Sequence, residues 1–109
     1  MTTSEIASMI GTLDVPYAYY QFPEGTAQPC PFICFYLPGS DDFIADDRNY
    51  AGISRLVIEL YTDEKDFTLE GEVESMLRTN NIVYIKTETY IDTERMWMIV
   101  YESEVILNG

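Results

Sequence analysis

The sequence has no histidine and few basic residues. Its 109 residues include 6 Lys or Arg against 19 Asp or Glu, so the formal net charge is -13. Without histidine the chain cannot build a Ser-His-Asp triad, a Cys-His pair or a histidine-ligated metal site. Phosphate binding needs clustered Lys and Arg. We therefore expect neither stable nucleic-acid binding nor attachment to an anionic membrane.

Long apolar runs are also missing, and no secretory leader is expected. No run approaches the roughly 20 residues that a transmembrane helix needs, and the first residues, MTTSE, lack a basic segment followed by an apolar one. Only two cysteines occur, Cys30 and Cys34. On one strand, positions four apart lie about 13 Å from each other, which is too far for a disulfide. We expect two reduced thiols and, with no other Cys or His, no zinc site.

Apolar residues are plentiful enough for a folded core. Hydrophobic residues make up 47% of the chain and aromatic residues 14%, so global disorder is not expected despite the charge. No repeat or linker divides the sequence, and its length suits one domain over residues 1–109.

Two segments, residues 2–13 and 66–79, carry the 3.6-residue periodicity of helices. The first begins with the capping-box spacing of Thr2 and Glu5, and the second is followed by Asn80-Asn81, a pair typical of a helix C-terminus. Glu70, Glu72 and Glu74 are expected to face water. The apolar stripes are Ile6, Met9, Ile10 and Leu13 in the first helix, and Leu69, Val73, Met76 and Leu77 in the second.

Strands are predicted in the rest of the chain. The run 32–37 (FICFYL) is apolar at every position, which predicts a strand covered on both faces. Within residues 54–62, Leu56, Ile58 and Leu60 alternate and share one face. The order α-β-β-β-α-β-β predicts an α+β domain, with an antiparallel or mixed sheet of about five strands packed with two helices. The predicted strands are residues 17–22, 32–37, 54–62, 83–91 and 96–106.

Residues 39–53 (GSDDFIADDRNYAGI) form a long loop or an extended hairpin in this prediction, and they carry paired acids. Two carboxylates can share general acid and base work, but nothing suggests the apolar pocket that would separate their pKa values. Calcium needs six to eight oxygens, and the EF-hand spacing is absent. A solvated loop is the favoured interpretation over a catalytic pair or a cation site. The paired acids are Asp41-Asp42 and Asp46-Asp47.

Phe43 and Tyr50 are large aromatic residues in this otherwise polar segment. Either they fold back and fix the loop to the domain, or they contact another subunit. With Asp46, Asp47 and Arg48 they are the candidate residues for a subunit or partner interface. No catalytic, cofactor-binding or metal-binding residue is predicted, and the chain is not expected to be an enzyme.

A pattern of strand and turn residues runs through segments 40–50 (SDDFIADDRNY), 58–62 (IELYT), 65–66 (KD), 70–74 (ExxVE), 83–91 (VYxKxExYI) and 94–101 (ERMWMIVY). Together these segments resemble a family of small structural proteins from tailed phages and prophages of Gram-positive bacteria. These proteins are assigned as tail terminator, tail completion or head–tail joining proteins. The resemblance covers residues 17–105 and consists of strand and turn residues, with no catalytic signature.

The resemblance implies an α+β protomer that closes into a ring, typically a hexamer, without cofactors. Such a ring caps the growing tail tube and joins it to the head connector. The implied partners are copies of the chain itself, the tail-tube protein and the head–tail connector protein. The implied location is the tail or neck of the virion, after assembly in the bacterial host cytoplasm. A negative lumen would repel DNA and let it slide through the ring.

Two other classes of function compete with this one. The charge also suits an acidic phage protein that mimics DNA or binds a host factor, although its acids are spread over loops, a helix and strand ends. A small hydrolase or metal-dependent enzyme using the aspartate loop is the weakest alternative. Of the 19 acids, 11 lie between Asp41 and Glu74, which indicates either a functional surface or a solubilising one.

Overall fold

A computed structural model of the chain describes all residues except 23–27, 41–43, 46–47, 50–51 and 108–109. Strands and helices follow the predicted order, with one further pair of very short strands inside residues 39–53. The elements are α1 (Thr3–Gly11), β1 (Tyr17–Tyr19), β2 (Phe32–Tyr36), β3 (Ile44–Ala45), β4 (Arg48–Asn49), β5 (Ile53–Thr62), α2 (Phe67–Thr79), β6 (Tyr84–Ile91) and β7 (Met96–Ile106).

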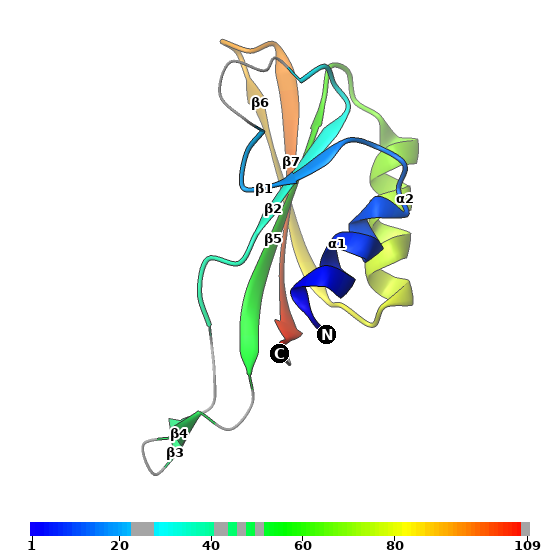
Figure 1. The fold of residues 1–109 in the computed structure, drawn as a ribbon. Helices are drawn as coiled ribbons and strands as arrows, with labels where there is room; N and C mark the ends of the chain where they lie inside the picture. The colour runs from blue at the N-terminus through cyan, green and yellow to red at the C-terminus, as the bar shows by residue number, and fades with distance from the viewer. Residues whose placement is uncertain (23–27, 41–43, 46–47, 50–51, 108–109) are drawn as a thin grey trace.

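The five longer strands form one mixed sheet in the order β1-β2-β5-β7-β6, and this confirms the predicted α+β class. β1 runs parallel to β2, whereas β2–β5, β5–β7 and β7–β6 are antiparallel. Parallel neighbours need a crossover of about a dozen residues, and the link from Tyr19 to Phe32 supplies one. The small antiparallel pair β3–β4 lies beyond the start of β5, away from the main sheet (Figure 1).

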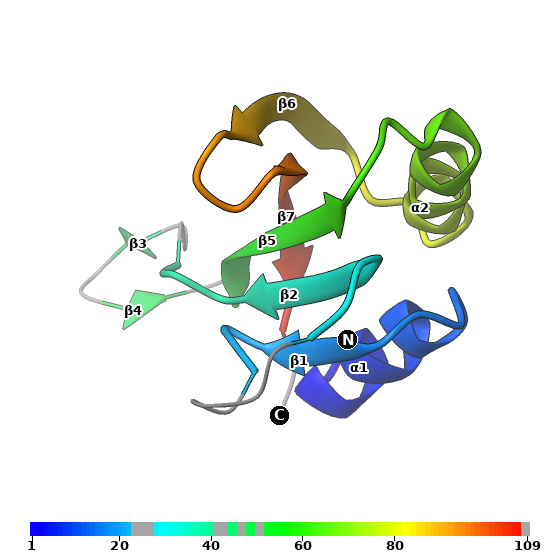
Figure 2. The same cartoon turned by 90° about the horizontal axis from the view of Figure 1, so that it is seen from above.

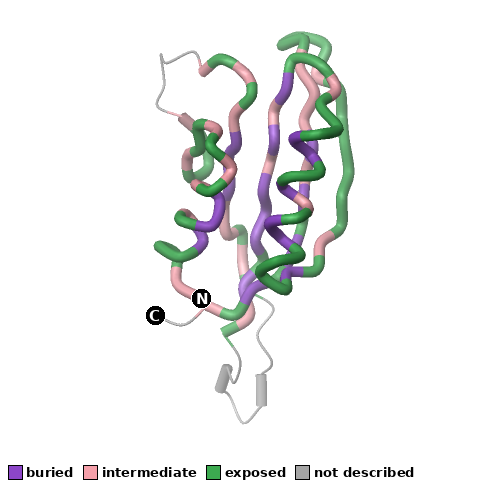
Figure 3. Tube along the Cα trace, turned by 90° about the vertical axis from the view of Figure 1, so that its right-hand side faces the viewer, coloured by how far each residue is buried: buried purple, intermediate pink, exposed green. Residues whose placement is uncertain are grey.

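Both helices pack against the same face of the sheet, here called the inner face (Figure 2). Alternation along β5 turns Leu56, Ile58 and Leu60 toward the helices, and all three are fully buried. Burying such side chains is worth about 1.5–3 kcal/mol each. The predicted helix stripes meet them there, and Figure 3 shows buried and exposed residues alternating along α2. The buried helix residues are Ile6, Met9, Ile10, Leu69, Val73, Met76 and Leu77.

The predicted helix ends are close to the observed ones. Thr2 and Glu5 form the capping box of α1, and the Asp66 carboxylate accepts a hydrogen bond from the Leu69 amide at the start of α2. Asn81 adopts a left-handed φ of 59° just beyond α2. α1 ends at Gly11, two residues before the predicted end, because Thr12 becomes its C-cap.

The prediction that Glu70 faces water is wrong. Glu70 is buried on the side of α2 that faces the sheet. It lies three and seven residues before Val73 and Leu77, so helical geometry places it on their stripe. Glu74, four residues further on, is half-buried on the same side, whereas Glu72 is exposed as predicted.

The opposite face of the sheet, called the outer face, has no described helix over it (Figure 2). The run 32–37 is therefore not covered on both faces as predicted, because its outward side chains Phe32 and Tyr36 stay half-exposed. In the described part of the chain, no helix is long and apolar enough to span a bilayer. The outward side chains of the three central strands include Phe32, Cys34, Tyr36, Val57, Glu59, Tyr61, Met98 and Val100.

Candidate functional site

The outer face carries an aromatic groove around Glu59, which we call the Glu59 groove. It encloses about 630 Å³. One wall comes from β2 and β5, and the others come from the chain after β1 and from the turn between β6 and β7. Its lining residues are Tyr20, Gln21, Phe22, Gln28, Phe32, Cys34, Glu59, Tyr61, Ile91, Glu94 and Met96.

Strand alternation and register place Glu59 in the middle of the outer face. Leu60 points inward, so its neighbour Glu59 must point outward. In the sheet, Glu59 lies between Cys34 of β2 and Val100 of β7. A carboxylate thus stands among apolar neighbours on a strand that is otherwise suited to a sheet core.

Two tyrosine hydroxyls hold the Glu59 carboxylate. The Tyr61 hydroxyl donates to Oε1 at 2.8 Å, and the Tyr36 hydroxyl donates to Oε2 at 3.1 Å. Each carboxylate oxygen therefore has one neutral donor. Hydrogen bonds to an ionised acceptor are stronger than neutral ones, so the carboxylate is fixed in one orientation.

Aromatic rings surround this carboxylate. Phe32 stacks on Tyr61 with ring centroids 4.7 Å apart, and Phe22 meets Phe32 edge-on at 5.5 Å. Tyr20 packs edge-on against Tyr36 at 5.8 Å. Such pairs stabilise one another beyond simple burial, so the groove wall is a preformed aromatic surface.

The protonation chemistry of the groove suits binding better than catalysis. Burial, reinforced by the nearby Glu59 carboxylate, raises the pKa of the Cys34 thiol to about 11. The same two causes raise the pKa values of the Tyr61 and Tyr36 hydroxyls. Reactive thiols need a lowered pKa. None of these three groups is activated as a nucleophile.

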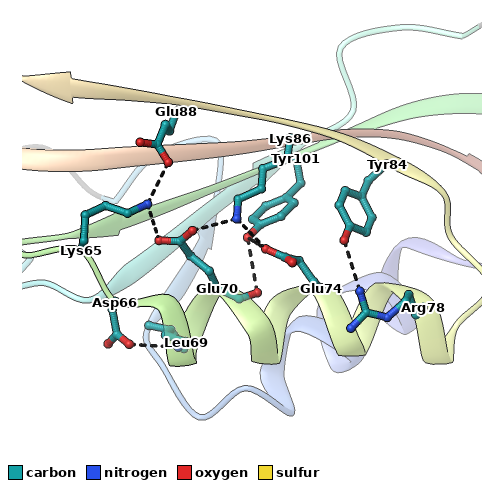
Figure 4. A network of polar contacts seen from close by, with 10 residues as sticks. All are labelled: Lys65, Asp66, Leu69, Glu70, Glu74, Arg78, Tyr84, Lys86, Glu88 and Tyr101. Carbon is teal, nitrogen blue, oxygen red and sulfur yellow. Dashed lines mark hydrogen bonds and ion pairs between the residues drawn. The ribbon is translucent and has the colours of Figure 1, made fainter.

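A second polar cluster lies between α2 and the inner face (Figure 4). Its centre is the buried Glu70, whose Oε2 lies 2.7 Å from the Lys65 ammonium and whose Oε1 lies 2.8 Å from the Lys86 ammonium. Lys65 also pairs with Glu88 at 2.8 Å. A buried carboxylate with two cations is electrically compensated, and this explains how α2 tolerates it.

Glu74 and Tyr101 complete this inner cluster. Lys86 lies 2.8 Å from Glu74, and the buried Tyr101 hydroxyl donates to the same carboxylate at 2.9 Å. Burial opposes ionisation of Glu74, but the hydrogen bonds from Lys86 and Tyr101 outweigh it and hold its pKa below the usual value. The cluster links α2 to β6 and β7, so its role is to hold helix and sheet together.

A smaller hollow of about 520 Å³ lies elsewhere on the outer face, and its charges are mixed. Its lining includes the basic residue Arg55 and the acids Glu102 and Glu104. In the sheet, Arg55 of β5 is the direct partner of Glu104 on β7. The Glu59 groove differs because its described lining contains acids and no base.

The predicted interface residues lie mostly outside the described residues. This applies to Phe43, Asp46, Asp47 and Tyr50, whereas Arg48 lies in β4 and pairs with Ala45 of β3. The aspartates considered for calcium or catalysis are outside the described residues as well. Within the described ranges, no group of three or more acids and cysteines could hold a metal. Both cysteines are free thiols, as predicted.

Sequence reasoning missed the Glu59 groove, although one signal was present. Glu59 interrupts the otherwise apolar run from Leu56 to Tyr61 (LVIELY), and Val57 and Tyr61 lie on the same face. Its contact with Tyr36 joins residues that are 23 positions apart on two paired strands, and the sequence alone does not define that pairing.

Comparisons with protein-family models, with curated proteins and with solved structures find no match to this chain.

Proposed function

We propose that the chain is a ring-forming structural subunit of a phage tail or neck, similar to tail terminator proteins. The observation that carries the proposal is the uneven cover of the sheet. Both helices lie on the inner face, while the outer face carries half-exposed apolar and aromatic side chains beside the charged residues Arg55, Glu102 and Glu104. A sheet face that exposes aromatic and apolar side chains, with no described helix over it, is typical of a surface that meets another subunit.

Two further features support assembly into a ring. A closed ring needs two different patches on each protomer, one meeting the other on its neighbour. The β3–β4 pair, which lies beyond the start of β5, supplies an arm distinct from the outer face (Figure 1). β6 supplies an exposed edge strand, which pairs only with β7 among the described strands.

In this proposal the partners are further copies of the chain, the tail-tube protein and the head–tail connector protein. The place of action is the tail or neck of the virion, and the ring carries out no catalysis. Its acidity, a net charge of -13, supports passage of DNA without binding, because negative walls repel phosphates. An acidic DNA mimic is less well supported, because Glu70 and Glu74 are turned inward and paired with lysines.

The oligomeric state tests the proposal. Native mass spectrometry and light scattering should detect a closed oligomer, alone or after mixing with the tail-tube protein, and electron microscopy should show rings. Ile85 is 70% exposed on the outer face, and Phe67 is 74% exposed at the start of α2, which packs on the inner face. We expect Ile85→Glu to dissociate the oligomer and Phe67→Glu to leave it intact.

A chain that stays monomeric at high concentration, both alone and with the tail-tube protein, contradicts the proposal. Equal effects of the two glutamate substitutions would instead show that the outer face is not the contact. Far-ultraviolet circular dichroism of both variants serves as the folding control. Both side chains are largely exposed, so neither substitution removes core packing.

A further inference from the structure

We infer that the Glu59 groove binds the guanidinium group of an arginine side chain from a protein partner. The inference concerns one protomer and goes beyond assembly into a ring, since it names a ligand for a site. It rests on the charge of the groove, on its aromatic walls and on the fixed orientation of its carboxylate.

The described lining of the groove carries negative charge and no basic residue. Glu59 lies in the groove and Glu94 lines it, and no Lys or Arg is among its described lining residues. Residues 23–27 (PEGTA), which follow Phe22 in the sequence, include no basic residue either. By contrast, the buried Glu70 on the inner face already faces two lysines. A half-buried carboxylate without a cation of its own attracts one from outside.

The aromatic walls favour a flat, weakly hydrated cation. Tyr20, Phe22, Phe32 and Tyr61 line the groove with the acids. Cations are attracted to the faces of aromatic rings. A guanidinium group also stacks on such rings and is less hydrated than an ammonium group, so it loses less on entering an apolar groove. The walls therefore select arginine over lysine.

The Glu59 carboxylate keeps acceptor capacity for this cation. An ionised carboxylate offers about four lone-pair sites, and Tyr36 and Tyr61 use one on each oxygen. Both oxygens can still accept one N–H of a guanidinium in the bidentate geometry typical of Arg–carboxylate pairs. Because the two hydroxyls already hold the carboxylate, little side-chain freedom is lost on binding.

Titration followed by two-dimensional amide NMR tests the inference on the full chain. The probe is N-acetyl-L-arginine amide, and its neutral counterpart is N-acetyl-L-citrulline amide, which has nearly the same shape without the charge. We expect the arginine probe to shift the amide signals of Phe32, Glu59 and Tyr61, with saturation at millimolar concentration. Signals of Glu70 and Lys86 on the inner face should stay in place.

Matched variants separate the groove from general acidity. Glu59→Gln keeps size and shape, and we expect it to weaken arginine binding at least tenfold. Glu102→Gln removes an exposed acid from the same face outside the groove, and it should leave binding within twofold. Tyr61→Phe keeps the ring and the charge and should weaken binding severalfold, which provides a second test if the Glu59 variant folds poorly.

Several results would overturn the inference. Equal binding of the arginine and citrulline probes would show that charge is not recognised, and unchanged binding by Glu59→Gln would place the site elsewhere. Tenfold tighter binding of free L-arginine than of the blocked probe would indicate a small-molecule site and not a partner side chain. Light scattering on the same samples measures the oligomeric state independently, so the outcome for arginine binding can be told apart from the outcome for ring assembly.

Discussion

Glu70 and Glu59 lie on opposite sides of the same sheet, and their surroundings differ in charge. Glu70 projects from α2 toward the inner face, and each of its oxygens lies within 2.8 Å of a lysine ammonium. Glu59 projects from β5 into the outer groove, and its oxygens accept hydrogen bonds from two neutral tyrosine hydroxyls. Among the described residues, cations thus balance the charge of Glu70 but not that of Glu59.

This difference distinguishes a structural charge from an available one. The ion pairs with the two lysines offset the desolvation cost of Glu70, and they join α2 to the sheet. The tyrosines orient Glu59 without cancelling its charge. Removing a partner should therefore damage the fold on the inner face, whereas on the outer face it should change binding and leave the fold nearly intact.

The substitution Lys86→Met is expected to have the largest effect, and it lowers the free energy of unfolding. The substitution keeps the apolar stem but leaves Glu70 and Glu74 with less compensation, and breaking a buried pair costs about 3 kcal/mol. Glu59→Gln should cost under about 1 kcal/mol, because the outer carboxylate is half-exposed and has no cation partner among the described residues. Urea denaturation of both variants measures the two free energies of unfolding. Equal losses would remove the distinction between the two acids.

Two tyrosines, one on each face of the sheet, allow a more closely matched comparison. Tyr101 and Tyr61 each donate a hydroxyl to a carboxylate, at 2.9 and 2.8 Å. Tyr101 is fully buried, so Tyr101→Phe should cost about 2 kcal/mol, the value typical of a hydrogen bond to a charged group. Tyr61→Phe, on the half-exposed outer face, should cost about 0.5–1 kcal/mol. A larger loss for Tyr61 in thermal unfolding would reverse the comparison.

Acid should weaken the inner cluster. The pKa of Glu74 is lowered in the folded chain from an ordinary value of 4.5. Its ionised form therefore stabilises the fold above about pH 4.5, and that contribution is lost as pH falls through the lower folded value. We expect the urea midpoint to decrease below pH 4.5, and to decrease less steeply in Lys86→Met. An identical slope in both proteins would argue against the Lys86–Glu74 pair as a source.

The smallest expected effect is chemical. Cys34 is buried in the groove wall with a pKa of about 11, whereas Cys30 is only half-buried. Iodoacetamide at pH 8 should modify Cys30 first and Cys34 much more slowly, since the thiolate is the reactive form. Peptide mass spectrometry measures the two rates. Equal rates would mean that the groove wall opens readily to solvent.

Local patterns predicted most of the fold. Alternation in β5 identified Leu56, Ile58 and Leu60 as core residues, and the capping box placed the start of α1. Both signals act over a few residues, which is why they are visible in sequence. The parallel pairing of β1 with β2 was not specified, because it depends on the path of the link between them.

The candidate site was largely beyond sequence reasoning. Glu70 was expected in water because it is charged, although its spacing from Val73 placed it on the buried stripe. The fold tolerates this buried charge because Glu70 pairs with Lys86, which lies on a strand that follows the helix. The Glu59 groove likewise needs a contact between neighbouring strands, β2 and β5. Sites of this kind arise from pairings between distant segments, which no local pattern encodes.

The strand order has a consequence for synthesis of the chain on the ribosome. β7 lies between β5 and β6, although it is the last of the five strands to be made. Until residues 96–106 have emerged, β6 has no partner in the sheet and β5 has an open edge. Exposed strand edges of this kind can form hydrogen bonds with strands of other chains. The nascent protein is therefore most exposed to aggregation just before β7 enters the sheet, and folding is completed late.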